Sequence, residues 1–389
     1  MKKVLYTGAF RFPEGDAAAF RVQSIAGLFD SLGYSVSFAG WESSAAGAEY
    51  NYRGYRCYPQ SEFRERKLGA VNRLLGFLFR GANTLRWLKS NRGFDVVVAY
   101  NPPALFALML QFLAWKRKFT LILDSTEWYE SAHLPGGRYG IAAVENWVRM
   151  RLVYPRFKNI ICISAFLENY FSTNNVVRVP PLVSWPIEAV SRDPLRSCIK
   201  CIYAGEAGKK DQVLDFVRAL PNISKKLNCR VIFTLLGQDW ESLRSLIEEQ
   251  GLVAQEYAPF VRCLGRVSRE RVAAEYKASH FSILLREDSR YAHAGFPTKA
   301  MESWSHGCPI ICNNVGDLGR LAVEFENAIV VDKKTIESQL IKAFQHIIGA
   351  DLWPGMSDHS IGKARQCFES SVYQPSFGAF LERADDKFR

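Results

Sequence analysis

Short runs of β-branched and apolar residues alternate with segments of helical periodicity, and this alternation occurs twice along the chain. Such alternation is the signature of βαβ units, which build a parallel sheet covered by helices. We therefore expect an α/β protein with two doubly wound domains. The expected strands are residues 4–7, 35–38, 95–99, 120–123 and 159–163 in the first series and 201–204, 231–236, 261–264, 281–285, 309–312 and 329–331 in the second.

A proline-rich segment, residues 179–186, separates the two series. Each proline lacks a backbone donor and restricts the residue before it, so we expect an extended linker here. The length of 389 residues fits two domains of roughly 100–200 residues each. We predict an N-terminal domain over residues 1–185, a C-terminal domain over 186–372, and a last helix over 373–389 that could pack across the boundary. Because open parallel sheets bind ligands beyond the carboxyl ends of their strands, two such domains predict a ligand cleft.

The chain carries an excess of basic residues, with a net charge of +11. Such an excess favours an anionic partner: nucleic acid, a phosphorylated small molecule or an anionic membrane. Nucleic acid is not expected, because the basic residues form no recognisable recognition module, and no G-x-G-x-x-G of a nicotinamide-binding domain follows the first strand. The longest apolar stretch, residues 104–115, is shorter than the ~20 residues that span a bilayer, and no secretory signal is found. We expect a cytoplasmic protein.

The most informative motif is Gly295-Phe-Pro-Thr-Lys-Ala-Met-Glu302. Pro297 and Thr298 suit the start of a helix, whose free amides and positive dipole end attract phosphate. Lys299 adds a cation at the same place, and Glu302 would lie one turn further along the helix. A carboxylate there can accept hydrogen bonds from vicinal hydroxyls such as those of a ribose. An ordinary helix start with a solvated lysine and glutamate explains the same residues.

This motif resembles the C-terminal donor-site motif of retaining glycosyltransferases of the GT-B fold, specifically the large family 4 with its Glu-x7-Glu pattern, in the branch written G-x-P-S/T-K-x-x-E. Five other segments are similar to the same family: residues 8–21 to its opening loop and helix, 124–129 to the segment that faces the cleft, 203–211 to its phosphate-side loop, 264–272 to its turn near the nucleotide base, and 284–288, which precede the donor motif at the family spacing. The resemblance extends over both predicted domains. It implies a GT-B fold, in which two Rossmann-like doubly wound domains face each other across a cleft.

The resemblance also implies how the donor sugar is held. Glu302 matches the second glutamate of the family pattern, which holds the donor ribose. Ala294 stands in place of the first glutamate, which contacts the donor sugar, and an alanine cannot do so. Glu287 or Asp288 could supply the missing carboxylate.

Cations are expected at the diphosphate of the donor. Glu206 stands where the family often has an arginine, so the expected cations are Lys209, Lys210 and Lys299, with Arg286 as a further candidate. Preorganised cations stabilise the charge that grows on the leaving β-phosphate oxygen, which makes Lys210 a candidate catalytic residue. With lysines in this role and no Asp-x-Asp motif, we expect neither a metal ion nor a cofactor besides the nucleotide sugar. The complete set expected at the donor is Gly8, Lys209, Lys210, Arg266, Val267, Arg286, Glu287, Gly295, Phe296, Pro297, Thr298, Lys299 and Glu302.

The predicted acceptor side is the carboxyl end of the expected strand 120–123. Asp124 and Glu127 follow this strand, where a carboxylate could orient or deprotonate an acceptor hydroxyl, so both are candidate catalytic residues. A turn cap at Asp124 and a solvated Glu127 explain the same pattern. Many family members have a histidine nearby, whereas here Thr126 is the nearest match. The residues expected at the acceptor are Arg21, Glu127 and His133.

A basic and apolar stretch over residues 63–92 is a candidate membrane contact. Basic heads beside an apolar face with a tryptophan are typical of helices that lie on anionic lipid, and many transferases of the resembled family act on lipid-linked acceptors. An ordinary domain helix with one buried face explains the pattern equally well. With lipid contact, the protein would be peripheral on the inner face of the cell membrane. The basic residues are Arg64, Arg66, Lys67, Arg73, Arg80, Arg86, Lys89 and Arg92.

Together these features predict a glycosyltransferase that moves a sugar, with retention, from a nucleoside-diphosphate sugar to a hydroxyl acceptor. The acceptor is expected to be a growing glycan or a lipid-linked glycan, in the assembly of a surface polysaccharide or glycolipid. Two alternatives stay open. One is a nucleotide-sugar epimerase of the same fold, and the other is a non-catalytic partner of another transferase, which the departures at Ala294 and Glu206 would fit.

Overall fold

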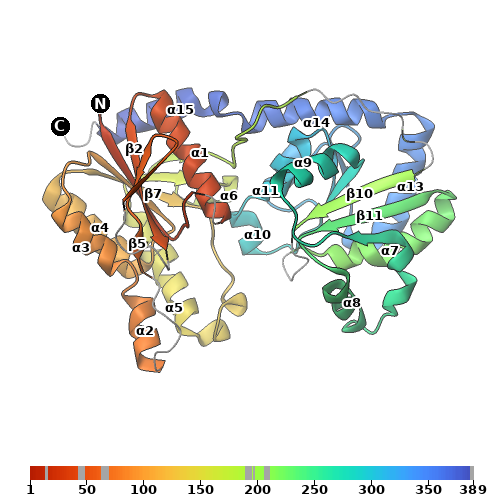
Figure 1. Cartoon of the computed structure of the whole chain (residues 1–389), viewed down its shortest axis with the longest axis horizontal. Coiled ribbons are helices and arrows are strands. Elements are labelled where there is room, and N and C mark those ends of the chain that lie inside the picture. The colour runs from red at the N-terminus through yellow and green to blue at the C-terminus, as the bar shows by residue number, and fades with distance from the viewer. Residues whose placement is uncertain are drawn as a thin grey trace. The chain divides into compact units, whose positions relative to one another are not determined.

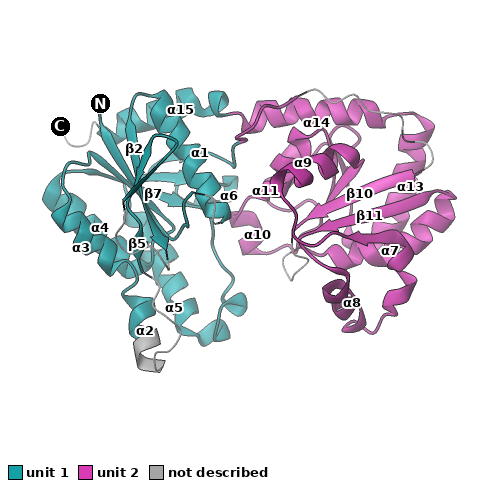
Figure 2. Ribbon diagram, viewed as in Figure 1, with its two compact units in different colours: residues 1–182, 370–389 teal, residues 183–369 magenta. Residues whose placement is uncertain are grey.

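The computed structural model describes residues 1–13, 16–42, 49–62, 70–188, 195, 198–205 and 211–385, with all their side chains except those of residues 70–73. The chain divides into two compact units, each with its own sheet (Figure 1). Figure 2 shows the first unit, Met1–Leu182 with Ser370–Arg389, in teal and the second unit, Val183–Glu369, in magenta. The last part of the chain thus returns to the first unit.

A predominantly parallel sheet forms the centre of the first unit. Its strands are β1 (Lys3–Gly8), β2 (Ser35–Glu42), β3 (Tyr50–Tyr52), β4 (Tyr55–Cys57), β5 (Gln60–Ser61), β6 (Val96–Tyr100), β7 (Thr120–Ser125), β8 (Asn159–Cys162) and β9 (Asn175–Arg178). They are ordered β3-β4-β2-β1-β6-β7-β8-β9, with β5 paired to β2. Every residue of β6 and β7 is buried, as expected for parallel strands covered on both faces.

Helices pack around the sheet of the first unit. They are α1 (Ala17–Ser31), α2 (Ala70–Leu78), α3 (Ala82–Ser90), α4 (Ala104–Arg117), α5 (Ile141–Val148), α6 (Ala165–Tyr170) and α15 (Ser370–Asp385), and a π-helical turn, η3 (Arg149–Val153), continues α5. Asp16 caps α1 by accepting a hydrogen bond from the amide of Ala19. The C-terminal helix α15 packs against α1 and β9, where Phe377 meets Phe29 edge to face at 5.0 Å between ring centroids.

The second unit has a parallel sheet in the order β12-β11-β10-β13-β14-β15. Its strands are β10 (Cys198–Ala204), β11 (Arg230–Leu236), β12 (Val261–Cys263), β13 (Phe281–Leu284), β14 (Ile310–Cys312) and β15 (Ala328–Val330). Its helices are α7 (Val213–Leu227), α8 (Trp240–Glu248), α9 (Arg269–Ala278), α10 (Arg290–Ala294), α11 (Thr298–Ser305), α12 (Leu318–Leu321), α13 (Ile336–Gly349) and α14 (Trp353–Phe368). The reversal of strand order beside β10 is the topological switch point at which such sheets bind ligands.

These two parallel sheets confirm the predicted α/β class with two Rossmann-like units. The strands β3, β4, β5 and β9 were not expected, because their short sequences, YNY, YRC, QS and NVVR, include polar residues and form no continuous apolar run. The β3–β4 hairpin depends on its turn, where Arg53 and Gly54 both adopt positive φ angles.

The basic stretch 63–92 lies only partly within the described residues. Residues 63–69, with Arg64, Arg66 and Lys67, fall outside them, and so does the side chain of Arg73. The rest forms two helices, α2 and α3, rather than one. The break falls at Gly81, whose φ of 101° favours glycine and whose position would bring a Cβ within 2.4 Å of the Phe106 ring.

Candidate functional site

A cavity of about 680 Å³ opens at the carboxyl ends of β10 and β11 in the second unit. Gly205 and Gly237 follow these two strands and line it, and α9 and α11 supply other walls. The volume fits a small-molecule site, which typically measures about 300–1,000 Å³. The predicted donor residues Arg266, Val267 and Glu302 all line this cavity.

Glu302 presents a carboxylate to this cavity. Its backbone carbonyl accepts a hydrogen bond from Ser305 at 2.9 Å, but its carboxylate receives no hydrogen bond from any residue that the structure describes. Burial raises the pKa of the Glu302 carboxyl above the ordinary 4.5, and the charges of Lys299 and Arg269 oppose that rise. A partly buried carboxylate without a donor suits a ligand that brings hydroxyl groups.

Aromatic rings form one wall of the same cavity. His306 stacks on Tyr276 at 5.8 Å between ring centroids and on Trp185 at 5.6 Å. Tyr276 is fully buried, and the buried indole N–H of Trp185 has no hydrogen-bond partner among the described residues. Sequence reasoning missed these three rings, because they come from the linker, α9 and the end of α11.

Lys299 lies at the start of α11, next to the end of β10. Its ammonium donates to Asp211 at 2.7 Å and lies 4.8 Å from the centroid of the Tyr203 ring. A Cβ on Gly205 would come within 2.7 Å of Cε of Lys299, so the lysine stem can occupy this place only beside a glycine. The lysine predicted for the diphosphate is therefore held in place by a carboxylate, a ring and a glycine.

Asp211 is the centre of this cluster and was not assigned a role from the sequence. It accepts a hydrogen bond from the hydroxyl of Tyr203 at 2.7 Å, and Nε of Arg286 lies 3.7 Å from its other oxygen. Burial alone would raise the pKa of the Asp211 carboxyl, but Lys299, Tyr203 and Arg286 together hold that pKa below its ordinary value. Asp211 therefore stays ionised and anchors Lys299. An acidic residue directly after two lysines is weak evidence for such a role. Lys299, its main partner, lies 88 residues further along the chain.

Arg286 is turned inward. It is only 8% exposed, and its guanidinium donates to the carbonyl of Ala292 at 3.2 Å. It braces Asp211, and it does not line the cavity described above. This geometry supports a role in holding the cluster together.

The remaining predicted donor residues lie at several separate places. Pro297 begins α11, which has no side-chain cap, so the amides of its first turn, at Thr298 and Lys299, suit an anion. Glu287 is exposed, and Phe296 packs edge to face on Phe368 at 5.7 Å. Gly295 lies between α10 and α11, and Gly8 ends β1 in the first unit. Glu206, Lys209 and Lys210 lie outside the described residues.

The place of the missing first glutamate is filled by a buried alanine. Ala294 ends α10 and has no exposed surface. Both predicted substitutes, Glu287 and Asp288, are exposed, and Asp288 pairs with His293 at 2.6 Å.

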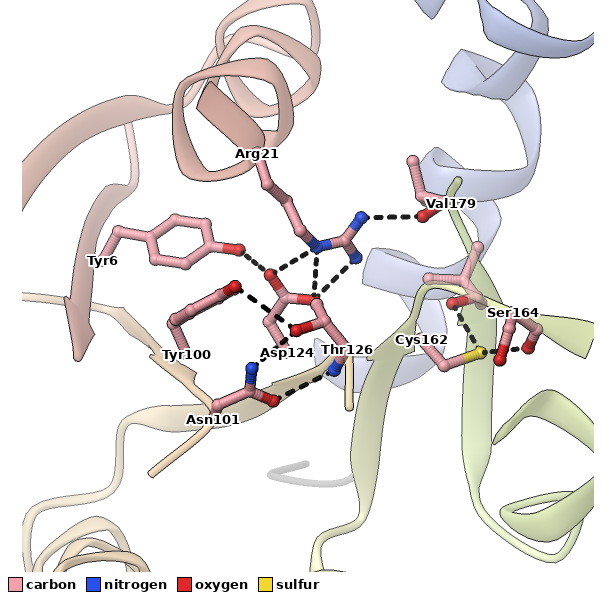
Figure 3. A network of polar contacts seen from close by, with 10 residues as sticks. Tyr6, Arg21, Tyr100, Asn101, Asp124, Thr126, Cys162, Ser164 and Val179 are labelled. Carbon is pink, nitrogen blue, oxygen red and sulfur yellow. Dashed lines mark hydrogen bonds and ion pairs between the residues drawn. The ribbon is translucent and has the colours of Figure 1, made fainter. Parts of the chain in front are cut away.

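The predicted acceptor residues Asp124 and Arg21 form a buried ion pair in the first unit (Figure 3). Arg21 of α1 donates to both carboxylate oxygens of Asp124, the shortest contact being 2.7 Å, and to the carbonyl of Val179 at 2.9 Å. Tyr6 of β1 donates to Asp124 at 2.5 Å. Burial, and then the Asp124 charge, raise the pKa of Tyr6 well above its ordinary value, so the hydroxyl remains a donor.

This pairing changes the interpretation of Asp124. The residue has no exposed surface, and its two oxygens are engaged by Arg21 and Tyr6. In this arrangement Asp124 joins α1 to β1 and β7. This pairing could not be predicted from local sequence, because Arg21 and Tyr6 lie 103 and 118 residues from Asp124.

Around this ion pair lies a second polar group, also drawn in Figure 3. Thr126 accepts from Asn101 at 2.5 Å and donates to the hydroxyl of Tyr100 at 3.3 Å. Glu127, directly after Thr126, is only partly buried, and His133 is exposed in a short helical turn. Glu127 and His133 are therefore the more accessible of the predicted acceptor residues.

The described residues contain neither a metal-binding cluster nor a membrane-spanning helix. In the described part of the chain, no group of His, Cys, Asp or Glu side chains gathers in a geometry that could hold a metal ion. No described helix is long and apolar enough to cross a membrane.

Most of the second unit is similar to a known protein family. Residues 199–349 match the family model for group 1 glycosyl transferases. This match contains β10, the Lys299 cluster and Glu302. No curated protein matches the chain in sequence.

Solved structures extend the likeness to the whole fold. Sucrose-phosphate synthase from Thermosynechococcus elongatus is 14% identical, with a TM-score of 0.72 over 98% of this chain and 99% of that one. WaaG, a glycosyltransferase involved in lipopolysaccharide biosynthesis, is 12% identical, with a TM-score of 0.65 over 97% and 99%. HepE of Anabaena, in complex with UDP and glucose, is 12% identical, with a TM-score of 0.64 over 98% and 100%. The chain therefore has the GT-B fold of these proteins.

Proposed function

We propose that this chain is a glycosyltransferase that takes its sugar from a nucleoside-diphosphate sugar bound to the second unit. The observation that carries the proposal is Glu302, whose carboxylate faces a cavity of about 680 Å³ without a hydrogen bond from the described residues. A ribose offers two adjacent hydroxyls to such a group. The group 1 glycosyl transferase match over residues 199–349 and the UDP and glucose found in HepE support this choice.

The diphosphate would lie at the start of α11. There the uncapped amides and the ammonium of Lys299 offer positive charge within one turn of Glu302. As the bond to the sugar breaks, negative charge grows on the β-phosphate oxygen, and Lys299 would stabilise it. Lys209 and Lys210 remain expected partners in this role, which would leave no need for a metal ion or another cofactor.

Asp211 is a positioning residue in this scheme. It holds the Lys299 ammonium at 2.7 Å before the donor arrives, and Arg286 at 3.7 Å supports the carboxylate from the other side. An ammonium has three donors, so Lys299 can bind a phosphate oxygen while it keeps its bond to Asp211. The lysine would then need no rearrangement when the donor binds.

The acceptor would bind to the first unit. We assign Glu127 as the candidate base for the acceptor hydroxyl, because it is partly exposed at the carboxyl end of β7, while Asp124 and Arg21 hold the surrounding elements. His133 is a further acceptor contact. The transfer would proceed with retention, onto a growing or lipid-linked glycan in surface-polysaccharide or glycolipid assembly, at the inner face of the cell membrane. The likeness to WaaG, which takes part in lipopolysaccharide biosynthesis, supports this setting.

The test of this function is a donor screen. The purified chain is incubated with UDP-, GDP-, ADP- and dTDP-sugars and its thermal unfolding is measured, since a ligand at about 100 times its Kd stabilises by roughly 2.7 kcal/mol. The stabilising donor is then mixed with glycan acceptors, and release of the nucleoside diphosphate is followed. Stabilisation by no nucleotide sugar would contradict the proposal. Conversion of the donor without any acceptor would instead favour an epimerase.

Donor binding should also depend on pH through Glu302. The carboxylate accepts hydroxyl donors only when ionised, and burial raises the pKa of this group above 4.5. Donor affinity should therefore fall as the pH drops towards the raised pKa, beginning above the range of an ordinary carboxyl. Glu302→Gln should weaken binding at neutral pH and remove this part of the pH dependence. Titration calorimetry between about pH 5 and 8 would check it; an unchanged pH profile in Glu302→Gln would exclude Glu302 as the titrating group.

A further inference from the structure

Helix α4 is apolar around most of its circumference but is covered on only one side. Its inward residues include Phe106, Leu110 and Leu113, which are buried. The residues Leu105, Leu108, Met109, Phe112 and Trp115 are exposed. Their spacing of three or four residues places them in one row along the helix. Phe112 and Trp115 are the most exposed, at 56% and 72%, and their rings lie 5.9 Å apart.

The neighbouring helix α5, with its continuation η3, carries a second exposed apolar row. The amide of Ala104 donates to Glu145 of α5 at 2.9 Å, and Gln111 donates to the carbonyl of Val153 in η3 at 3.3 Å, so the two elements lie side by side. The exposed residues of this row are Ile141, Val144, Trp147 and Leu152. In the second unit, the large apolar side chains exposed among the described residues are only Val253 and Val323. The exposed apolar surface is therefore concentrated on the first unit.

A cationic cavity lies on the other side of α4. It measures about 670 Å³ between α3 and α4, and Phe112 and Met109 of the exposed row also line it. Its basic residues are Lys89, Arg92, Lys116 and Arg117, and no acidic residue is among the described residues that line it. Arg117 also donates to the carbonyls of Leu88 and Lys89, which fixes the end of α3 against α4. Positive charge and an exposed aromatic row thus meet along one helix.

We propose that the exposed rows of α4 and α5, together with the α3–α4 cavity, bind the surface of a bilayer that contains anionic phospholipid. Phe112 and Trp115 enter the interfacial region of the bilayer, where the amphipathic indole of Trp115 is stable and the apolar ring of Phe112 leaves water. Lys89, Arg92 and Lys116, which line the cavity, bind lipid phosphates at the anionic surface.

Charge decides against a second copy of this chain as the occupant. Each copy carries a net charge of +11 and presents the same basic cavity beside the apolar rows, so two such faces repel each other. An anionic lipid surface is complementary to both the charge and the apolar rows. The inference deepens the membrane setting proposed above and names helices outside residues 63–92. It is tested without a sugar donor, so it can fail or hold independently of the transferase proposal.

The experiment is flotation of the full chain with vesicles of phosphatidylcholine alone or mixed with phosphatidylglycerol. The wild type should float with the mixed vesicles, and the Phe112→Ser/Trp115→Ser variant should bind them at least about tenfold more weakly, because two large apolar side chains no longer enter the bilayer. Val253→Ser is the matched control, since it removes an apolar side chain that is 61% exposed in the second unit. It should float like the wild type.

The charge arm uses Lys89→Glu/Lys116→Glu, which should abolish the preference for phosphatidylglycerol and the salt sensitivity of binding. Unchanged thermal unfolding of all variants shows that they fold. The proposal is overturned if the Phe112→Ser/Trp115→Ser variant floats like the wild type. It is also overturned if the wild type is a dimer by light scattering and this variant is a monomer, because the rows then cover each other.

Discussion

Replacing Lys299 by alanine is expected to reduce sugar transfer by about 10²–10³-fold, the usual effect of removing one preorganised donor from a developing oxyanion. The geometry makes the lysine hard to replace. Its ammonium is fixed at 2.7 Å from Asp211 and 4.8 Å from the centroid of the Tyr203 ring, and its stem passes over Gly205. A mobile surface lysine would first lose side-chain entropy on binding phosphate, whereas Lys299 is already ordered. Steady-state rates with the donor identified by screening would check this expectation.

A variant of Asp211 separates the contribution of the Lys299 charge from the contribution of its fixed position. Asp211→Asn keeps the shape but removes the charge that positions Lys299, so it should lower transfer less than Lys299→Ala does. Lys363→Ala in α14 is the control for the loss of one positive charge, and it should retain donor binding and transfer. Equal effects of Lys299→Ala and Lys363→Ala would exclude Lys299 from the donor site. A rise in KM alone, with kcat unchanged, would assign Lys299 to ground-state binding.

The strands that the sequence predicts are those formed by continuous apolar runs. The central strands β1, β6 and β7 are apolar runs, so all three were expected. The strands β5 and β9, with the sequences QS and NVVR, are short and include polar residues, so they form no continuous apolar run. The break between α2 and α3 depends on packing of Gly81 against Phe106, a contact that the local sequence does not encode.

The candidate site divides in the same way. Lys299 and Glu302 come from one helix turn, so their spacing alone predicts that they lie together. The contacts that give these residues their environment are not local: Asp211 lies 88 residues from Lys299, and Trp185 reaches the cavity from the linker. The exposed row on α4 was part of the apolar stretch 104–115, but a sequence does not tell which side of an apolar helix is left uncovered.

Removing one partner of the buried Arg21–Asp124 pair is expected to give the largest loss of stability. Both side chains are almost fully buried, at 7% and 0% exposure, and the guanidinium makes its shortest contact at 2.7 Å. Asp124→Leu leaves a buried positive charge and the Tyr6 hydroxyl without their acceptor. The free energy of unfolding of the first unit should fall by about 3–5 kcal/mol. Urea unfolding, with hydrogen exchange of α1 and β7 to identify the unit that opens, measures it.

The double variant Arg21→Leu/Asp124→Leu tests the cause. With neither charge buried, it should recover much of the stability lost by Asp124→Leu, because desolvation of a buried ion pair offsets most of its attraction. Asp385→Leu is the matched control, because it breaks an exposed ion pair with Lys2. The side chains of Asp385 and Lys2 are 34% and 49% exposed, so this variant should change the free energy of unfolding by less than about 1 kcal/mol. Asp124→Asn tells a structural role from a catalytic one. If Asp124 only positions other residues, the rate of sugar transfer should fall in proportion to the fraction of folded protein. Full stability with transfer abolished in Asp124→Asn would instead return Asp124 to the reacting hydroxyl.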